Sequence, residues 1–176
     1  MDRIGFGQVE PNHLSAMRTH QIYAQLPAAA SINVLENGQF AKYDYAAGEV
    51  NFAGEGEFML VLNEVKLYDG YRETYKDFAL QTKDFTDGKI YPRLYKTNIG
   101  DIITTNCLEA AGTKGAKTST VGNYTIGTKL TVNAQGFLEE NSSPKATDMV
   151  WVVVTPVVGS SNLPDGQEAV KIQRIQ

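Results

Sequence analysis

The sequence has a single cysteine, Cys107, and only two histidines, His13 and His20. One thiol cannot form an intramolecular disulfide, and two histidines seven residues apart without a clear third ligand make a poor metal site. Cys107 lies in an apolar, strand-like run over residues 101–108, which predicts a buried structural thiol and not a reactive nucleophile. We therefore expect neither a metal site nor a cofactor.

The chain also lacks an excess of basic residues and any long apolar run. It has 16 Lys and Arg against 20 Asp and Glu, a formal net charge of -4. Binding to nucleic acid or to an anionic membrane favours a surplus of Lys and Arg. No stretch approaches the roughly 20 apolar residues that cross a bilayer, and the first residues lack the apolar core of a signal peptide. We expect a protein that binds neither nucleic acid nor membranes and is made in a reducing cytosol.

Motifs that carry catalysis are missing as well. The sequence contains neither a Gly-x-Ser-x-Gly elbow nor a His-Glu-x-x-His zinc motif. Residues 112–119 resemble a phosphate-binding loop, but Ala116 stands where that motif requires glycine. Glu55 and Glu57 could share a strand face, yet the adjacent glycines favour a solvated turn over a glycosidase pair. The sequence predicts that the protein is not an enzyme and has no catalytic residues.

What the chain does have is a series of short apolar segments separated by turn signals. Asn37-Gly38 predicts a hairpin, and residues 133–136 predict a turn between two further strands. The run over residues 58–68 predicts a strand that is buried on both faces at its start. Residues 149–156, which hold the only tryptophan, have the strongest β character. These patterns predict a mainly β fold: a β-sandwich or partly closed β-barrel of at least seven short strands, with at most one short helix.

The pattern divides the chain into an extended N-terminal arm, residues 1–30, and a single β domain, residues 31–176. The arm has no clean period, but its apolar residues are too many for a solvated tail, so they must pack on this domain or on a neighbour. The residues expected to anchor the arm are Phe6, Val9, Leu14, Ile22 and Tyr23.

Three segments of the domain carry further expectations. Residues 69–89 are compatible with either a short helix or a long loop, and residues 111–123 predict a mobile surface loop. Residues 169–175 alternate cleanly, which places Val170, Ile172 and Arg174 on one face of a strand and makes the C-terminal segment part of the fold.

Tyrosine is unusually dense: seven of the nine tyrosines lie between residues 43 and 95. Because a buried tyrosine hydroxyl needs a hydrogen-bond partner, a cluster of tyrosines is typical of a surface that is partly exposed to solvent. Three interpretations remain open, namely a protein–protein interface, a carbohydrate-stacking surface, and partly exposed sheet residues without a partner.

Two regions of the chain carry a resemblance. Residues 5–15 (GFGQVEPNHLS), 21–27 (QIYAQLP) and 35–40 (LENGQF) resemble small proteins encoded beside the major capsid protein in tailed phages. Residues 127–137 (GTKLTVNAQGF), the turn at 164–167 (PDGQ) and the strand around 170–172 (VKI) resemble β-rich capsid decoration, or cement, proteins.

The resemblance implies a virion structural protein that binds the assembled phage head and stabilises it. Its implied partners are the major capsid protein and further copies of itself, with a trimer favoured, and the anchor residues of the arm would contact the capsid or another subunit. Its implied location is the virion, assembled in the host cytoplasm. Two other hypotheses remain. One is another virion module, such as a head fibre or tail component that contacts host glycans through the tyrosine-rich region, and the other is a small β-barrel enzyme or ligand binder.

Overall fold

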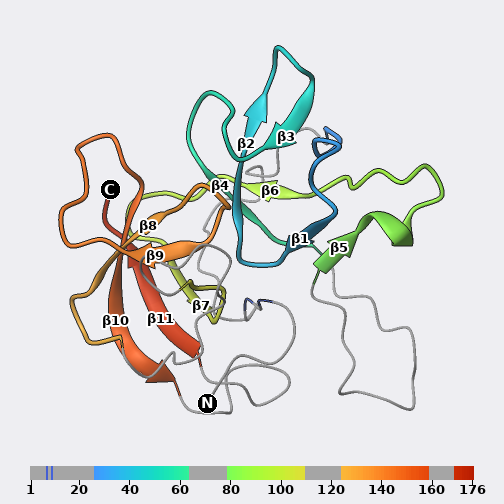
Figure 1. Cartoon of the computed structure of the whole chain (residues 1–176). Helices are drawn as coiled ribbons and strands as arrows, with labels where there is room; N and C mark the ends of the chain where they lie inside the picture. The colour runs from blue at the N-terminus through green and yellow to red at the C-terminus, as the bar shows by residue number, and fades with distance from the viewer. Residues whose placement is uncertain (1–6, 8, 10–25, 64–78, 110–123, 159–168) are drawn as a thin grey trace, which may run out of the picture.

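A computed structural model of the chain describes residues 7, 9, 26–63, 79–109, 124–158 and 169–176 (Figure 1). These residues contain eleven strands and one short 3-10 turn, Thr82–Asp84. The predicted mainly β fold, with at least seven short strands and at most one short helix, is confirmed over this part of the chain. The segment 69–89 is described only from Ala79, where it forms a strand and the 3-10 turn, and residues 111–123 lie outside the described residues.

The strands form three antiparallel sheets. The five-stranded sheet has the order β7-β11-β10-β8-β9, with β7 at Ile102–Thr105, β8 at Lys129–Val132, β9 at Leu138–Glu140, β10 at Val150–Val158 and β11 at Ala169–Arg174. The four-stranded sheet has the order β3-β2-β4-β6, with β2 at Phe40–Asp44, β3 at Glu49–Asn51, β4 at Met59–Val61 and β6 at Leu94–Tyr95. β1, Val34–Glu36, pairs with β5, Ala79–Gln81. Since none of these three sheets closes on itself, the fold is sandwich-like and not a closed barrel.

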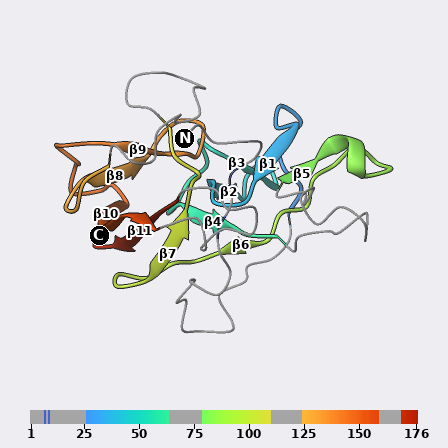
Figure 2. The same ribbon diagram turned by 90° about the horizontal axis from the view of Figure 1, so that it is seen from below.

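The four-stranded sheet is the middle layer. In β4, Leu60 belongs to an apolar cluster shared with the five-stranded sheet, whereas Met59 and Val61 belong to a second cluster shared with β1 and β5. Successive side chains of a strand point to opposite faces, so this alternation buries both faces of β4. The prediction that the run over residues 58–68 is buried on both faces near its start is confirmed for Met59–Val61, and residues 64–68 lie outside the described residues. Figures 1 and 2 show β10 and β11 on one side of the molecule and β1 and β5 on the other.

The first apolar cluster is centred on Trp151, which is fully buried and lies with its ring centroid 5.7 Å from that of Phe40. Trp151 comes from β10 and Phe40 from β2, so this contact joins the two larger sheets. A fully buried large apolar side chain stabilises the fold by about 1.5–3 kcal/mol relative to an exposed one. We therefore attribute most of the cohesion between these two layers to the first cluster.

The predicted turn at residues 133–136 is confirmed, because it joins the antiparallel pair β8 and β9. The backbone N–H of Phe40 donates to the carbonyl of Gly136 at 2.7 Å, bringing this turn against β2. A Cβ at Gly136 would lie 2.3 Å from the carbonyl oxygen of Phe40, and the residue has a φ of 81°. Both facts require glycine here.

The turn at Asn37-Gly38 forms as predicted, but the predicted hairpin is wrong. β1 pairs with β5 and β2 pairs with β3 and β4, so the turn joins strands of two different sheets. The reason lies in the turn's own backbone, which pairs with β4: Gly38 N–H donates to Val61 O, and Val61 N–H donates to Gln39 O. At this turn the chain therefore passes from the β1–β5 pair to the four-stranded sheet. In a two-residue hairpin, β1 and β2 would instead have paired with each other.

Candidate functional site

The described residues contain no group of three or more His, Cys, Asp or Glu side chains that could hold a metal ion. Cys107 is completely buried, as the sequence predicted, beneath the Asn37-Gly38 turn. His13 and His20 lie outside the described residues. No helix within the described ranges is long and apolar enough to cross a membrane.

Of the five predicted contact residues, only Val9 is described. It is 3% exposed, belongs to the first apolar cluster, and forms an isolated antiparallel bridge with Thr105 at the edge of β7. Val9 therefore packs on its own domain, the first of the two alternatives for the arm. The other four, Phe6, Leu14, Ile22 and Tyr23, lie outside the described residues.

Residues 26–30, at the end of the predicted arm, are also bound to the domain. Ala29 N–H donates to Val50 O at 2.8 Å, and Val50 N–H donates to Pro27 O at the same distance, so this segment covers the outer edge of β3. Ala28 N–H donates to Ile90 O at 2.7 Å. Hydrogen-bonding groups on the outer edge of β3 are thereby satisfied within the chain.

Three of the sequence stretches named above, 5–15, 35–40 and 127–137, are joined by hydrogen bonds. Gly7 N–H donates to the Glu36 carboxylate at 2.5 Å, Gln39 Nε2 donates to Gln135 O at 2.9 Å, and Phe40 N–H donates to Gly136 O. We call this group the motif junction: Gly7, Glu36, Gln39, Phe40, Gln135 and Gly136. It joins three stretches that lie far apart in sequence, since Gln39 and Gln135 alone are separated by 96 positions.

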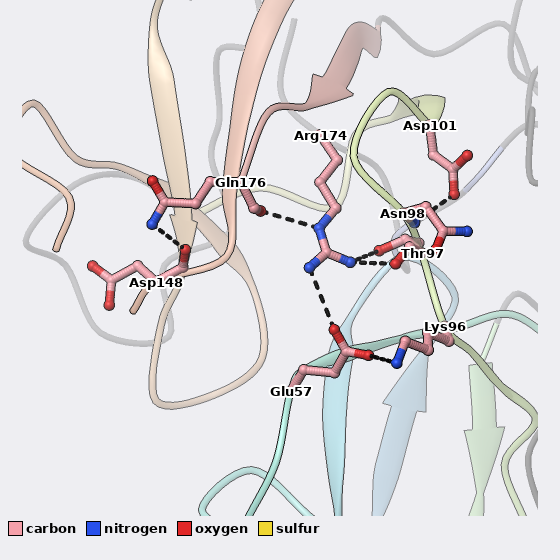
Figure 3. A network of polar contacts seen from close by, with 8 residues as sticks. All are labelled: Glu57, Lys96, Thr97, Asn98, Asp101, Asp148, Arg174 and Gln176. Atoms are coloured by element: carbon pink, nitrogen blue, oxygen red, sulfur yellow. Dashed lines mark hydrogen bonds and ion pairs between the residues drawn. The ribbon is translucent and has the colours of Figure 1, made fainter. Parts of the chain in front are cut away.

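Arg174 forms a second junction, at the C-terminal end of β11 (Figure 3). Its Nε donates to Gln176 O at 3.0 Å, its Nη1 donates to both the carbonyl and the hydroxyl oxygen of Thr97, and its Nη2 contacts Glu57 Oε2 at 3.4 Å. Glu57 also pairs with Lys96 at 2.6 Å. Because Glu57 precedes β4 and Thr97 follows β6, Arg174 ties the five-stranded sheet to the four-stranded sheet.

A groove of about 790 Å³ opens beside Arg174, between the start of β4, the β8–β9 hairpin and residues 145–149. Its charged lining is balanced, with three acidic residues (Glu57, Glu139 and Asp148) and three basic residues (Lys42, Lys145 and Arg174). Lys42 holds its ammonium 4.5 Å from the centre of the Phe58 ring. Of these charged residues, Glu57 and Arg174 join the two sheets through the contact given above.

Only some tyrosines of the tyrosine-rich region are exposed among the described residues. Tyr43 is buried in the second cluster, whereas Tyr45 is 74% exposed and its ring centroid lies 5.5 Å from that of Tyr43. Tyr91 is 38% exposed and donates its hydroxyl to Asp87 at 3.2 Å. That hydrogen bond raises the pKa of the Tyr91 phenol above its ordinary value.

The segments that hold Tyr45 and Tyr91 also border a hollow of about 560 Å³. It is lined by residues 27–30, 32–33, 47–49, 82 and 87–90. Many of the lining residues are small: Ala28, Ala29, Ala30, Ala47, Gly48 and Gly88. The hollow is bordered by the turn between β2 and β3, which is anchored by Asp44 accepting the Ala47 N–H at 3.0 Å. This bond and the Asn51 side chain lower the pKa of Asp44.

Sequence reasoning identified part of these sites. The alternation of residues 169–175 placed Arg174 on the same face as Val170 and Ile172, and both apolar residues are fully buried. An arginine on the same strand face as buried apolar residues indicates that its guanidinium has polar partners inside the protein. Glu57 is exposed, as predicted for a glycine-flanked solvated segment, and its carboxylate also faces Arg174 and Lys96. The hollow was missed, because its lining comes from segments far apart in sequence.

No protein-family model matches the chain, and neither a curated protein nor a solved structure matches it significantly.

Proposed function

We propose that the protein is a structural component of a tailed-phage particle that binds the outside of the head and stabilises it. Its partner would be the major capsid protein, its location the virion, and its assembled form a homo-oligomer, with a trimer favoured. In this role it has no catalytic residues and no cofactor.

The observation that carries the proposal is the motif junction. The resemblance to phage head proteins rests on short stretches scattered along the sequence, and a chance likeness gives no reason for them to contact one another. Gly7, Gln39 and Gly136 come from three of these stretches, which are joined by direct hydrogen bonds. These stretches therefore pack against one another in this chain, as we would expect of segments that form one part of a common fold.

The stability of the described fold is compatible with a reinforcing role. Trp151 and Phe40 join the two larger sheets through apolar contact, and Arg174 joins them again through hydrogen bonds. A rigid module loses little conformational freedom when it attaches to a shell, so more of its contact energy remains to hold neighbouring subunits together.

Co-sedimentation tests the proposal. Purified full-length protein is mixed with assembled capsids of its own phage that lack it, and bound protein is quantified after pelleting. We expect saturable binding, with a stoichiometry that matches a repeated site on the shell, and a higher temperature of capsid disruption. Capsids of an unrelated phage serve as the control. Absence of binding to its own capsids at micromolar concentration would reject the proposal.

A further inference from the structure

Large exposed apolar side chains are unevenly distributed over the described residues. They are Val34, Tyr45, Tyr91, Ile99, Ile126 and Ile175. The three isoleucines lie at the turns before β7 and β8 and just after β11, all on the five-stranded sheet. Val34 lies in β1, Tyr45 directly follows β2, and Tyr91 precedes β6, so these three lie outside the five-stranded sheet.

Val34, Tyr45 and Tyr91 all adjoin the segments that line the small-residue hollow. Val34 follows Asn33, whose carbonyl accepts the Thr82 N–H at 3.1 Å, and both Asn33 and Thr82 line the hollow. The hydroxyl of Tyr91 is bound to Asp87, another lining residue. Tyr45 lies two residues before Ala47 and is braced by its contact with Tyr43. We call this surface, the hollow with Val34, Tyr45 and Tyr91 around it, the tyrosine face.

The tyrosine face has the composition of a protein-binding site. Tyrosine is enriched where partner proteins bind, because it offers a large contact area at a low cost in side-chain entropy. Tyr45 is held by Tyr43 before any partner arrives, so binding loses little of its freedom. The small residues beneath leave room for a side chain of a partner to enter.

The charge around the hollow selects the partner. Of the charged residues that line the hollow, Glu49 and Asp87 are acidic and Lys89 is basic. The flanking residues Asp44, Lys83 and Asp84 add one further net negative charge. An acidic surface beside exposed aromatic rings favours a cationic side chain, which gains from the carboxylates and from the ring faces. The Lys42 ammonium above Phe58 is an example of the second contact within this chain.

We propose that the tyrosine face is the surface that docks on the capsid, and that it receives a lysine or arginine side chain of the capsid protein in the hollow. This inference rests on the proposed function. Tyr45 provides the exposed ring, and Glu49 and Asp87 provide the negative charge.

The experiment compares full-length variants in the capsid co-sedimentation assay. Tyr45→Ala and the double variant Glu49→Gln/Asp87→Asn should each weaken binding at least about tenfold, as removal of a central interface residue does. Ile99→Ala and Ile126→Ala are matched controls, since both isoleucines are 71% exposed and lie outside the tyrosine face. They should bind like the wild type. Binding by the wild type should also weaken as salt is raised, and the double variant should have a smaller salt dependence.

The outcomes separate the two proposals. No binding by the wild type rejects the proposed function, whereas normal binding by the Tyr45 and acidic variants rejects only the docking surface. Loss of binding in the isoleucine variants would move the interface to the five-stranded sheet and overturn the inference. Binding of neutral oligosaccharides that is lost in Tyr45→Ala, with capsid binding retained, would make the tyrosine face a glycan site and overturn it as well. Circular dichroism of each variant confirms that it is folded.

Discussion

At the scale of single residues, Arg174 is the side chain whose polar contacts link separate sheets most directly. Its side chain is 11% exposed and donates to Gln176 O, to both oxygens of Thr97 and to Glu57. Arginine suits this position because its planar guanidinium directs several N–H groups at once in a fixed geometry. Replacing it removes these donors from the Thr97 carbonyl and the Glu57 carboxylate.

We predict that Arg174→Ala lowers the free energy of unfolding by about 2–4 kcal/mol, since several partly buried hydrogen bonds to a charged group are lost together. Arg174→Lys should lose less unfolding free energy than Arg174→Ala but should not match the wild type, because an ammonium cannot reproduce the several fixed hydrogen bonds of the planar guanidinium. Urea unfolding followed by Trp151 fluorescence measures both. The matched control is Lys96→Ala: Lys96 pairs with the same Glu57 but is 43% exposed, so its loss should cost less than about 1 kcal/mol. Equal effects of the two alanine variants would contradict the central role of Arg174.

At the scale of elements, the N-terminal segment around Val9 behaves as part of the sandwich. Val9 bridges Thr105 at the edge of β7 and enters the first apolar cluster. Gly38 passes close to it: a Cβ at Gly38 would lie 3.1 Å from Val9 Cγ2 and 2.6 Å from Cys107 Cβ. The segment thus covers an edge strand and fills the space above a glycine turn.

We predict that Val9→Ala lowers the free energy of unfolding by about 1.5–3 kcal/mol, since methyl groups leave a packed core. It should also increase the rate at which a thiol reagent modifies Cys107, which is completely buried beside the same turn. Val34→Ala is the control, because Val34 is the same residue type but exposed, and its substitution should change stability by less than about 0.5 kcal/mol. If Val9→Ala matched this control in both measurements, residues 7 and 9 would not be part of the folded core.

The elements also show which features the sequence could predict. The turn at residues 133–136 and the strand at 169–175 were predictable because alternation and turn residues act over a few positions. The Asn37-Gly38 turn gave an equally strong local signal, but β1 pairs with β5, more than 40 residues further along the chain. Turn chemistry specifies a reversal and not which strands pair afterwards. The hollow beneath the tyrosine face was unpredictable for the same reason, since three separate segments line it.

At the scale of the whole molecule, the two apolar clusters share their strands. In β2, Phe40 belongs to the first cluster and the next residue, Ala41, to the second, and β4 divides its side chains in the same way. A strand cannot leave one cluster and remain in the other. We therefore expect the three sheets to unfold in a single cooperative transition, as one domain of this size commonly does.

The variant Leu35→Ala tests this coupling. Leu35 is fully buried in the second cluster, and Trp151, the only tryptophan, is fully buried in the first. Removing the leucine side chain should cost about 2–5 kcal/mol. Because the clusters share β2 and β4, the whole of this loss should appear in the unfolding midpoint reported by Trp151 fluorescence, and far-UV circular dichroism should give the same midpoint. Leu138→Ala, in the first cluster, should shift both signals together as well.

A Trp151 transition that stays at the wild-type position in Leu35→Ala, while the circular dichroism transition moves, would show that the clusters unfold independently. The four-stranded sheet would then be a boundary between two cooperative units and not the layer that couples them, even though Leu60 and its neighbours Met59 and Val61 contact both clusters.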